Sequence, residues 1–174
     1  EPGIISLYSG KKYLRLFIIG LLQRYNLKRA NVSIFLTEYA KKLIAPSSSG
    51  IIIPHGIEQS WRGFWKASFS DTIRILYVSN AAPYKGHMEL IKAIEILNRK
   101  EQKIHLTCVG GESGTEAQKI KKYITLQNID HIVKLKPLKK RADIKKDYLE
   151  NDIFIFASKC ENMPNTLVEA VLSG

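Results

Sequence analysis

The sequence has few cysteines and no long hydrophobic run, and each shortage argues against a class of protein. Its 174 residues include only Cys108 and Cys160, too few for the disulfide scaffold of a small secreted domain. Both fit a reducing compartment, so we expect a cytoplasmic protein. The longest early apolar run, residues 16–22, is far shorter than the roughly 20 residues of a membrane-spanning helix. The first ten residues also show no signal-peptide pattern.

Acidic residues are scarce relative to basic ones. The chain has 27 Lys and Arg against 16 Asp and Glu, a net charge of +11. Such a balance admits nucleic acid, an anionic membrane surface or phosphorylated small molecules as partners. Aromatic residues are not interleaved with the basic ones, which disfavours nucleic acid. Basic residues flank the early apolar run within residues 11–30, which we expect to form a helix. They form either a solvated face or a peripheral contact with a membrane.

From Ile73 onward, apolar segments alternate with segments of helical periodicity. We expect strands over 73–78, 104–109, 132–135 and 153–157, and helices over 86–99, 115–127, 141–150 and 165–173. Continuously apolar strands separated by helices are typical of a parallel sheet that is covered on both faces. The predicted fold class is therefore α/β, with a Rossmann-like, doubly wound sheet. Ligands of such sheets bind beyond the carboxyl ends of the strands.

The first third of the chain has a different pattern. After the helix over 11–30 we expect a short strand over 32–36, a short helix with Thr37 as its N-cap, and a strand over 51–53. Residues 58–70 lack periodicity and suggest a linker. We divide the chain into the tail of one domain (1–50), an interdomain region (51–70) and a second, incomplete domain (71–174). The chain lacks an initiator Met and stops in mid-pattern, so we expect a piece of a longer protein.

Three loops that follow strands have residues suited to an anionic ligand. The first, 79–86, contains Asn80 and Lys85 before a helix start, where free N–H groups and a cation suit phosphate. It lacks the G-x-G-x-x-G pattern, which disfavours an NAD enzyme. The second begins with Gly110 and Gly111, which either approach a ligand closely or form a flexible turn. The third contains lysines after Leu135 that either face a phosphate or, more commonly in proteins, are simply exposed.

The fourth loop places two carboxylates eight positions apart. Glu161 precedes a helix that we expect to begin near Asn165, and Glu169 lies about one turn inside that helix. We expect both carboxylates to converge with the N–H groups of Asn165, Thr166 and Leu167. This arrangement suits a ligand with hydroxyls at both ends and a diphosphate between them. The alternative is that Glu161 is a surface loop residue and Glu169 a solvated helix residue. Against this alternative, Glu169 lies in an apolar stretch, where a carboxylate needs a partner.

These segments resemble a known family. Glu161 to Glu169 matches the E-x7-E motif of retaining glycosyltransferases of family 4, the "glycosyl transferases group 1" type. The strings around residues 151–170, 78–86 and 55–58 resemble the same family in order and spacing. The resemblance implies a GT-B architecture of two Rossmann-like domains, with the donor held mainly by the C-terminal one. It also implies transfer from a nucleotide-diphosphate sugar with retention, without a metal and with no cofactor besides the donor.

The resemblance also assigns roles to residues. Glu161 would contact the hydroxyls of the donor sugar and Lys85 the diphosphate, and these two are the predicted catalytic residues. Glu169 would bind the ribose. The remaining predicted binding residues are the backbone of Asn165, Thr166 and Leu167 over the phosphates, Gly110 and Gly111 near the nucleotide, and Asn80. Asn80 stands where the family usually has Arg, so either the donor is held differently or another basic residue substitutes. Glu58 stands where Asp is usual.

The leading hypothesis is therefore a hexosyltransferase of polysaccharide biosynthesis that acts on a glycan or lipid-linked acceptor. We expect no turnover from this chain alone, because most of an acceptor domain would be missing. One alternative is another nucleotide-diphosphate-sugar enzyme of the same build, such as an epimerase. A second is a non-catalytic basic module that docks on a membrane. Binding of nucleoside diphosphates separates the enzymes from the docking module.

Overall fold

The computed structural model describes residues 11–46, 49–57, 61 and 71–174, with backbone only for residues 11–13. The chain forms two compact units. The smaller contains residues 1–56 together with 160–165, and the larger contains residues 57–159 together with 166–174. The domain boundaries inferred from the sequence stay a prediction. Most of the predicted linker, 58–70, lies outside the described residues.

The smaller unit contains two helices and a short parallel sheet. Its elements are α2 (Lys11–Arg29), β1 (Ile34–Phe35), α3 (Glu38–Ile44) and β2 (Ile51–Ile52). Strands β1 and β2 pair in parallel, with Ile34 opposite Ile51. The predicted cap is confirmed, because the Thr37 hydroxyl accepts a hydrogen bond from the Ala40 N–H at 3.1 Å. Among the described residues, no helix is both long and apolar enough to cross a bilayer.

The larger unit is built on a four-stranded parallel sheet. Its elements are β3 (Ile73–Val78), the 3-10 turn η2 (Pro83–Lys85), α4 (His87–Arg99), β4 (Ile104–Val109), α5 (Thr115–Leu126), β5 (Val133–Lys136), α6 (Arg141–Glu150), β6 (Ile153–Phe154) and α7 (Asn165–Ser173). The strand order is β5-β4-β3-β6, and every pairing is parallel. The predicted α/β class and doubly wound build are therefore confirmed.

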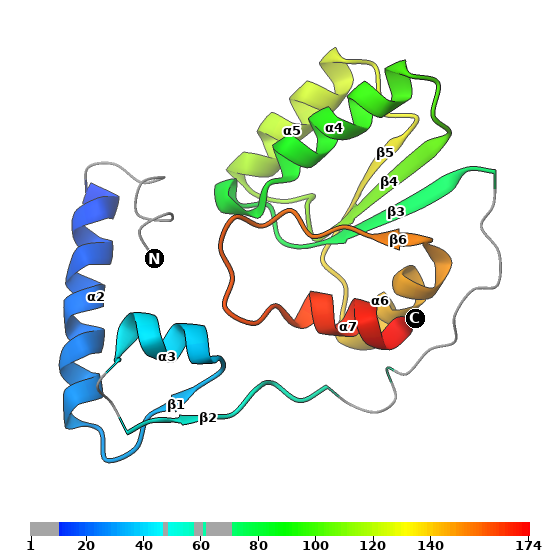
Figure 1. Cartoon of the computed structure of the whole chain (residues 1–174). Helices are drawn as coiled ribbons and strands as arrows, with labels where there is room; N and C mark the ends of the chain where they lie inside the picture. The colour runs from blue at the N-terminus through cyan, green and yellow to red at the C-terminus, as the bar shows by residue number, and fades with distance from the viewer. Residues whose placement is uncertain (1–10, 47–48, 58–60, 62–70) are drawn as a thin grey trace. The chain divides into compact units, whose positions relative to one another are not determined.

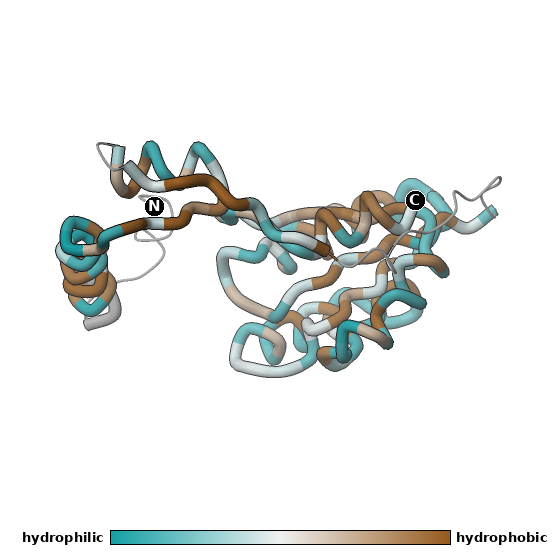
Figure 2. Tube along the Cα trace, turned by 90° about the horizontal axis from the view of Figure 1, so that it is seen from below, coloured by the Kyte–Doolittle hydropathy of each residue, from teal (hydrophilic) through white to brown (hydrophobic). Residues whose placement is uncertain are grey.

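Helices cover both faces of this sheet (Figure 1). Alternation along β3 sends Ile75 and Tyr77 to one face and Leu76 and Val78 to the other. The first face packs against α4 and α5, and the second against α6 and α7. The hydrophobic colouring of α7 in Figure 2 follows from its apolar sequence. The central strand β3 is thus buried on both sides from Ile75 to Val78, which explains why that part of the strand is continuously apolar.

Two expectations need correction. The predicted strand 153–157 pairs only over Ile153–Phe154, although the Ile155 N–H still donates to the Leu76 carbonyl at 2.9 Å. Strand β6 is the edge strand of the sheet, next to β3, and its Ile153 is exposed. The predicted helix 86–99 begins one residue later, at His87, with Gly86 as its N-cap, and its Leu97 is exposed. The buried face extends to the polar His87, a position that apolar periodicity does not reveal.

The strand order creates a switch point beside β3. The chain runs outward from β3 through β4 to β5 and then returns to place β6 on the other side of β3. The connections that leave β3 and β6 therefore diverge at the carboxyl edge of the sheet. In doubly wound sheets this divergence opens the crevice in which ligands bind.

Loop three is fixed by a buried carboxylate. Asp147 on α6 is 1% exposed, and its two oxygens accept from Lys136 Nζ at 3.0 Å and Lys139 Nζ at 2.5 Å. The expectation that these lysines are simply exposed is therefore wrong for Lys136 and Lys139. Burial raises the pKa of Asp147, but hydrogen bonds from the two ammonium groups outweigh it and leave that pKa below its usual value.

Gly86 links the first loop to the segment after β6. Its φ is +73°, and an added Cβ would lie 2.2 Å from the Ala157 carbonyl oxygen. We expect Gly86→Ala in the full-length protein to lower the free energy of unfolding by about 3 kcal/mol or more, because strain and a backbone clash add. Gly114→Ala also meets a positive φ, in a region that is nearly exclusive to glycine (φ 94°, ψ 171°), but it meets no atom within 4 Å, so we expect the strain alone, about 1–3 kcal/mol. Urea unfolding measures both, and equal losses would contradict the close packing at Gly86.

Asp147→Asn should destabilise the larger unit at neutral pH by about 1–3 kcal/mol, since both ammonium groups lose a charged acceptor but remain partly hydrated. Because the folded pKa of Asp147 is lowered, its stabilisation is complete above about pH 4 and disappears as the pH falls through the folded pKa. Urea unfolding across this range should therefore show a steeper acid loss for the wild type than for Asp147→Asn. Asp143→Asn, an exposed change on the same helix, is the control and should retain the wild-type slope.

Candidate functional site

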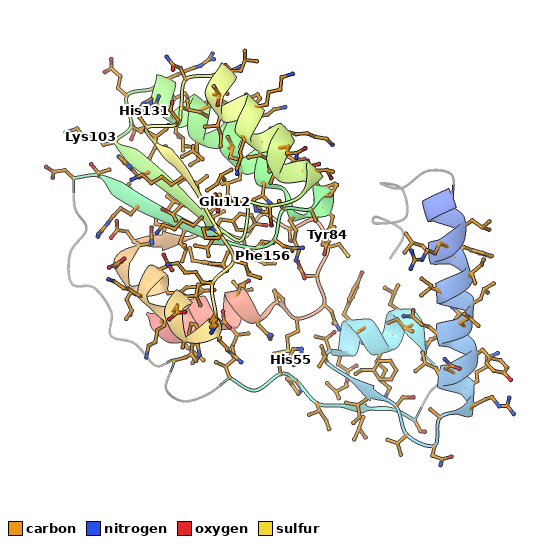
Figure 3. All side chains as sticks on the ribbon, turned by 180° about the vertical axis from the view of Figure 1, so that it is seen from behind. His55, Tyr84, Lys103, Glu112, His131 and Phe156 are labelled. Atoms are coloured by element: carbon orange, nitrogen blue, oxygen red, sulfur yellow. The ribbon has the colours of Figure 1, made fainter. Side chains whose placement is uncertain are left out.

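The candidate site lies at the carboxyl edge of the larger unit's sheet. Figure 3 shows Tyr84, Glu112 and Phe156, which follow β3, β4 and β6, at one end of the sheet. Lys103 and His131, which precede β4 and β5, lie at the opposite end. Parallel pairing produces this segregation, because it brings the outgoing loops of all strands to one edge. The first and second loops predicted from the sequence both lie there.

Hydrogen bonds fix the first loop around Lys85. The Tyr77 hydroxyl donates to the Lys85 carbonyl oxygen, and the Lys159 N–H donates to the Tyr84 carbonyl at 2.8 Å. The ammonium group of Lys85 lies 5.0 Å from the centre of the Tyr84 ring. Asn80, in the same loop, is exposed. The loop is thus held by β3 on one side and by the segment after β6 on the other.

The second loop is fixed to its neighbours by backbone contacts. Gly110 and Gly111 are both buried. The Gly110 N–H donates to the Lys136 carbonyl at 3.0 Å, and the Ser79 N–H donates to the Val109 carbonyl at 2.9 Å. The ends of β3, β4 and β5 are therefore linked across the carboxyl edge. This rigidity suits a site whose backbone must keep its position.

Glu169 is a buried carboxylate with partners on both oxygens. It is 6% exposed. The Tyr148 hydroxyl donates to Oε2 at 3.1 Å, and Arg141 Nε lies 3.3 Å from Oε1. The expectation that a carboxylate in this apolar stretch needs a partner is confirmed. A salt bridge and a hydrogen bond keep the carboxylate oriented.

An aromatic layer supports this carboxylate. Tyr148 makes an edge contact with Trp61, with ring centres 5.6 Å apart. The Arg141 guanidinium lies 5.7 Å from the centre of the Trp61 ring. Burial raises the pKa of Tyr148, and the charge of Glu169 raises it further. Tyr148 therefore stays protonated and available as a hydrogen-bond donor.

The start of α7 is the third element of the site. The helix begins at Asn165 as predicted, and its first turn contains no acidic residue. Asn165 and Leu167 are exposed, and Thr166 is half-buried. The Thr166 carbonyl oxygen also lies 3.1 Å from the Tyr148 hydroxyl, so the single O–H proton of Tyr148 is shared between the first turn of the helix and Glu169. The positive end of a helix dipole is favourable for an anion.

Glu161 belongs to the smaller unit, where it is half-buried. Its neighbours contact the ends of β1 and β2. The Thr37 hydroxyl donates to Asn162 Oδ1 at 2.6 Å, and the His55 N–H points to the Met163 sulfur at 3.3 Å. Since Glu169 belongs to the larger unit, the convergence of the two carboxylates stays a prediction.

Sequence reasoning missed Tyr148 and Arg141 as partners of Glu169. Both lie on α6 seven positions apart, which places them on one face of a helix. That spacing is visible in the sequence, but it does not show which helix face packs against Glu169. His87 was also missed, because a lone histidine at a helix start does not distinguish a buried ring from an exposed one.

Comparisons with known proteins identify the family. Residues 62–174, more than half of the chain, match the family model described as Glycosyl transferases group 1. No curated protein sequence matches the chain significantly.

Three of the solved structures that share this fold illustrate the likeness. TarM of S. aureus aligns at 21% identity and a TM-score of 0.72, over 95% of this chain and 31% of its own. The pneumococcal O-GlcNAc transferase GtfA, in complex with UDP and GlcNAc, aligns at 19% and 0.71, over 87% and 30%. Sucrose-phosphate synthase from Thermosynechococcus elongatus aligns at 19% and 0.79, over 99% and 46%. The chain thus spans less than half the length of each. It belongs to the glycosyl transferases group 1 family and has a GT-B type α/β fold.

Proposed function

We propose that the larger unit binds the nucleotide-diphosphate sugar of a glycosyltransferase. The observation that carries this proposal is the buried carboxylate of Glu169, held by Tyr148 and Arg141 beside the start of α7. A buried carboxylate costs free energy unless it is paired, and here it lies next to a helix end suited to phosphate. Family membership supports the same class of activity. So does the fold shared with a transferase that was solved with UDP and GlcNAc.

In this proposal Glu169 binds the ribose. A carboxylate oxygen has two lone pairs and accepts more than one hydrogen bond. Tyr148 donates to one oxygen and Arg141 contacts the other, so each retains capacity for a ribose hydroxyl. Trp61 packs against Tyr148 and so supports the hydroxyl that contacts the carboxylate. A preoriented acceptor binds a diol with little loss of side-chain entropy.

The diphosphate is assigned to Lys85 and the first turn of α7. Both supply positive potential, one as an ammonium group and the other as N–H groups at a helix start. Loss of a nucleoside diphosphate as leaving group develops negative charge, and preorganised donors stabilise it. We propose that these groups supply this stabilisation without a metal ion. Gly110 and Gly111 line the nucleotide, and Asn80 contributes a neutral donor.

Glu161 is assigned to the hydroxyls of the donor sugar, and transfer is proposed to proceed with retention. We do not assign Glu161 and Glu169 as a nucleophile pair like that of glycosidases, because Glu169 serves the ribose. The acceptor is proposed to be a glycan or a lipid-linked glycan. Helix α2 has basic residues in its last turn and no acidic residue in its first, and we propose peripheral contact of that helix with an anionic membrane.

Nucleotide binding tests the proposal. We expect UDP or GDP to bind the full-length protein in calorimetry. Glu169→Gln should weaken binding by about 10–100-fold, since loss of hydrogen bonds to a charged group costs about 1–3 kcal/mol. Tyr148→Phe should weaken it by about 2–10-fold, the scale of one neutral hydrogen bond, because Glu169 loses its orientation.

Glu150→Gln is the matched control, since Glu150 is exposed and lies at the end of α6, and it should bind as the wild type does. Thermal melts confirm that each variant is folded. If no nucleoside diphosphate binds the wild type, the proposal is wrong. If Glu169→Gln binds as tightly as the wild type, the ribose assignment is wrong. A protein that epimerises a nucleotide sugar but transfers none would favour the epimerase.

A further inference from the structure

His87 is a fully buried histidine without hydrogen bonds. It is the first residue of α4 and is 1% exposed. Within the described part of the chain, neither Nδ1 nor Nε2 has a hydrogen-bond partner. Buried polar nitrogens are normally paired, and an apolar ring of similar size would fill this space without leaving unpaired nitrogens. The retention of an imidazole here calls for a reason besides packing.

The ring of His87 fills the space between the two loops of the candidate site. It packs against Tyr77 with ring centres 4.7 Å apart, and Tyr77 in turn donates to the Lys85 carbonyl oxygen. On another side it meets the second loop. A Cβ added to Gly111 would lie 3.3 Å from Nε2 and from Cδ2 of the ring. An added side chain at Gly111 would therefore require the ring to shift by a few tenths of an ångström.

We propose that His87 is a positioning residue of the donor site, whose uncharged imidazole sets the separation between the Lys85–Gly86 turn and the Gly110–Gly111 turn. Protonation would make donor binding weaker. The inference rests on the proposed function, because it assigns the two turns to one bound nucleotide. His87 does not touch the ligand in this account. It acts on the Lys85–Gly86 turn through Tyr77, which donates to the Lys85 carbonyl oxygen. It acts on the other turn by direct packing against Gly111.

The charged surroundings of the ring favour its neutral form. Burial lowers the pKa of His87, the Ser79 backbone opposes this shift, and the Lys85 ammonium adds to it. Glu116 at the start of α5 acts in the opposite direction, and Tyr77 on β3 packs against the ring, while Cys108 on β4 lies by the same Gly111 position. A protonated ring needs acceptors for two N–H groups. Only the Ser79 backbone favours a proton on the ring from nearby main chain, so a second N–H would stay unpaired, and protonation should push the ring out of its enclosure and separate the turns.

The sign of the pH effect distinguishes this role from direct contact. If His87 touched a phosphate, protonation would strengthen binding of an anion as the pH falls. If it acts as a neutral spacer, protonation weakens binding. Below the pKa of His87 in the unliganded protein, the affinity for the nucleotide should fall by up to about tenfold per pH unit. This is the largest effect that the binding of one proton can have. The phosphates of the nucleotide titrate in the same range, so the wild type must be compared with a variant that does not titrate here.

The experiment measures UDP and GDP affinity of the full-length protein by calorimetry between about pH 8 and about pH 5. His87→Phe keeps a ring against Tyr77, and His87→Gln stays neutral at every pH. We expect affinity to fall more steeply with acid in the wild type than in either variant. His131→Gln is the control, because His131 is exposed at the opposite edge of the sheet, and it should follow the wild type.

Parallel pH profiles for the wild type and both His87 variants would overturn the proposal, as would wild-type affinity that rises relative to the variants in acid. Hydrogen exchange without ligand provides a second measurement. Corrected for intrinsic rates, residues 79–86 and 110–114 should lose protection in acid in the wild type and retain it in the folded variant. If no nucleotide binds at any pH, the proposed function fails. In that case hydrogen exchange alone tests the positioning role of His87. Equal protection of the two segments in acid, in the wild type and in the variant, would reject that role.

Discussion

The parallel pairing of β3 with strands on both sides is the constraint on which the larger unit depends. β3 pairs along its whole length with β4, and near its middle with β6. Parallel pairing sends every outgoing loop to one edge, and the reversal of strand order beside β3 separates the loops that leave β3 and β6. The core on each face then fixes this edge, because Leu76 and Tyr77 are buried on opposite faces of the strand.

Buried polar groups then give the edge its chemical character. Glu169 and Asp147 are both buried carboxylates, but their partners differ. Asp147 accepts from two lysines and fixes the third loop. Glu169 has a neutral hydroxyl and one partly exposed arginine as partners. Asp147 has an ammonium partner on each oxygen, and we regard it as structural. Glu169 retains the capacity to accept further hydrogen bonds, and it lies beside a helix start. This difference is why we assign the ligand to Glu169.

Much of the larger unit could be predicted from sequence, because β3 and β4 are largely buried on both faces and α4, α5 and α7 are amphipathic. The bounds of β3, β4, α6 and α7 agree with the structure. The edge strand β6 was predicted too long, since apolar composition alone does not show where a partner strand stops pairing.

The candidate site was harder to predict. The need of Glu169 for a partner followed from its apolar neighbours, but its partners on α6 depend on how two helices pack. The enclosure of His87 likewise depends on the close approach of Gly111. Such tertiary contacts leave little trace in local pattern. Motif resemblance identified the glycosyl transferases group 1 family correctly, while the retaining family 4 assignment and the roles of individual residues stay predictions.

The most direct test of the central claim is a crystal structure of the full-length protein with UDP or GDP bound. We expect the ribose hydroxyls within hydrogen-bond distance of Glu169, and the diphosphate between Lys85 and the first turn of α7. A nucleotide bound at the opposite edge of the sheet, near Lys103 and His131, would contradict the account. So would a nucleotide at the carboxyl edge whose ribose leaves Glu169 paired only with Tyr148 and Arg141.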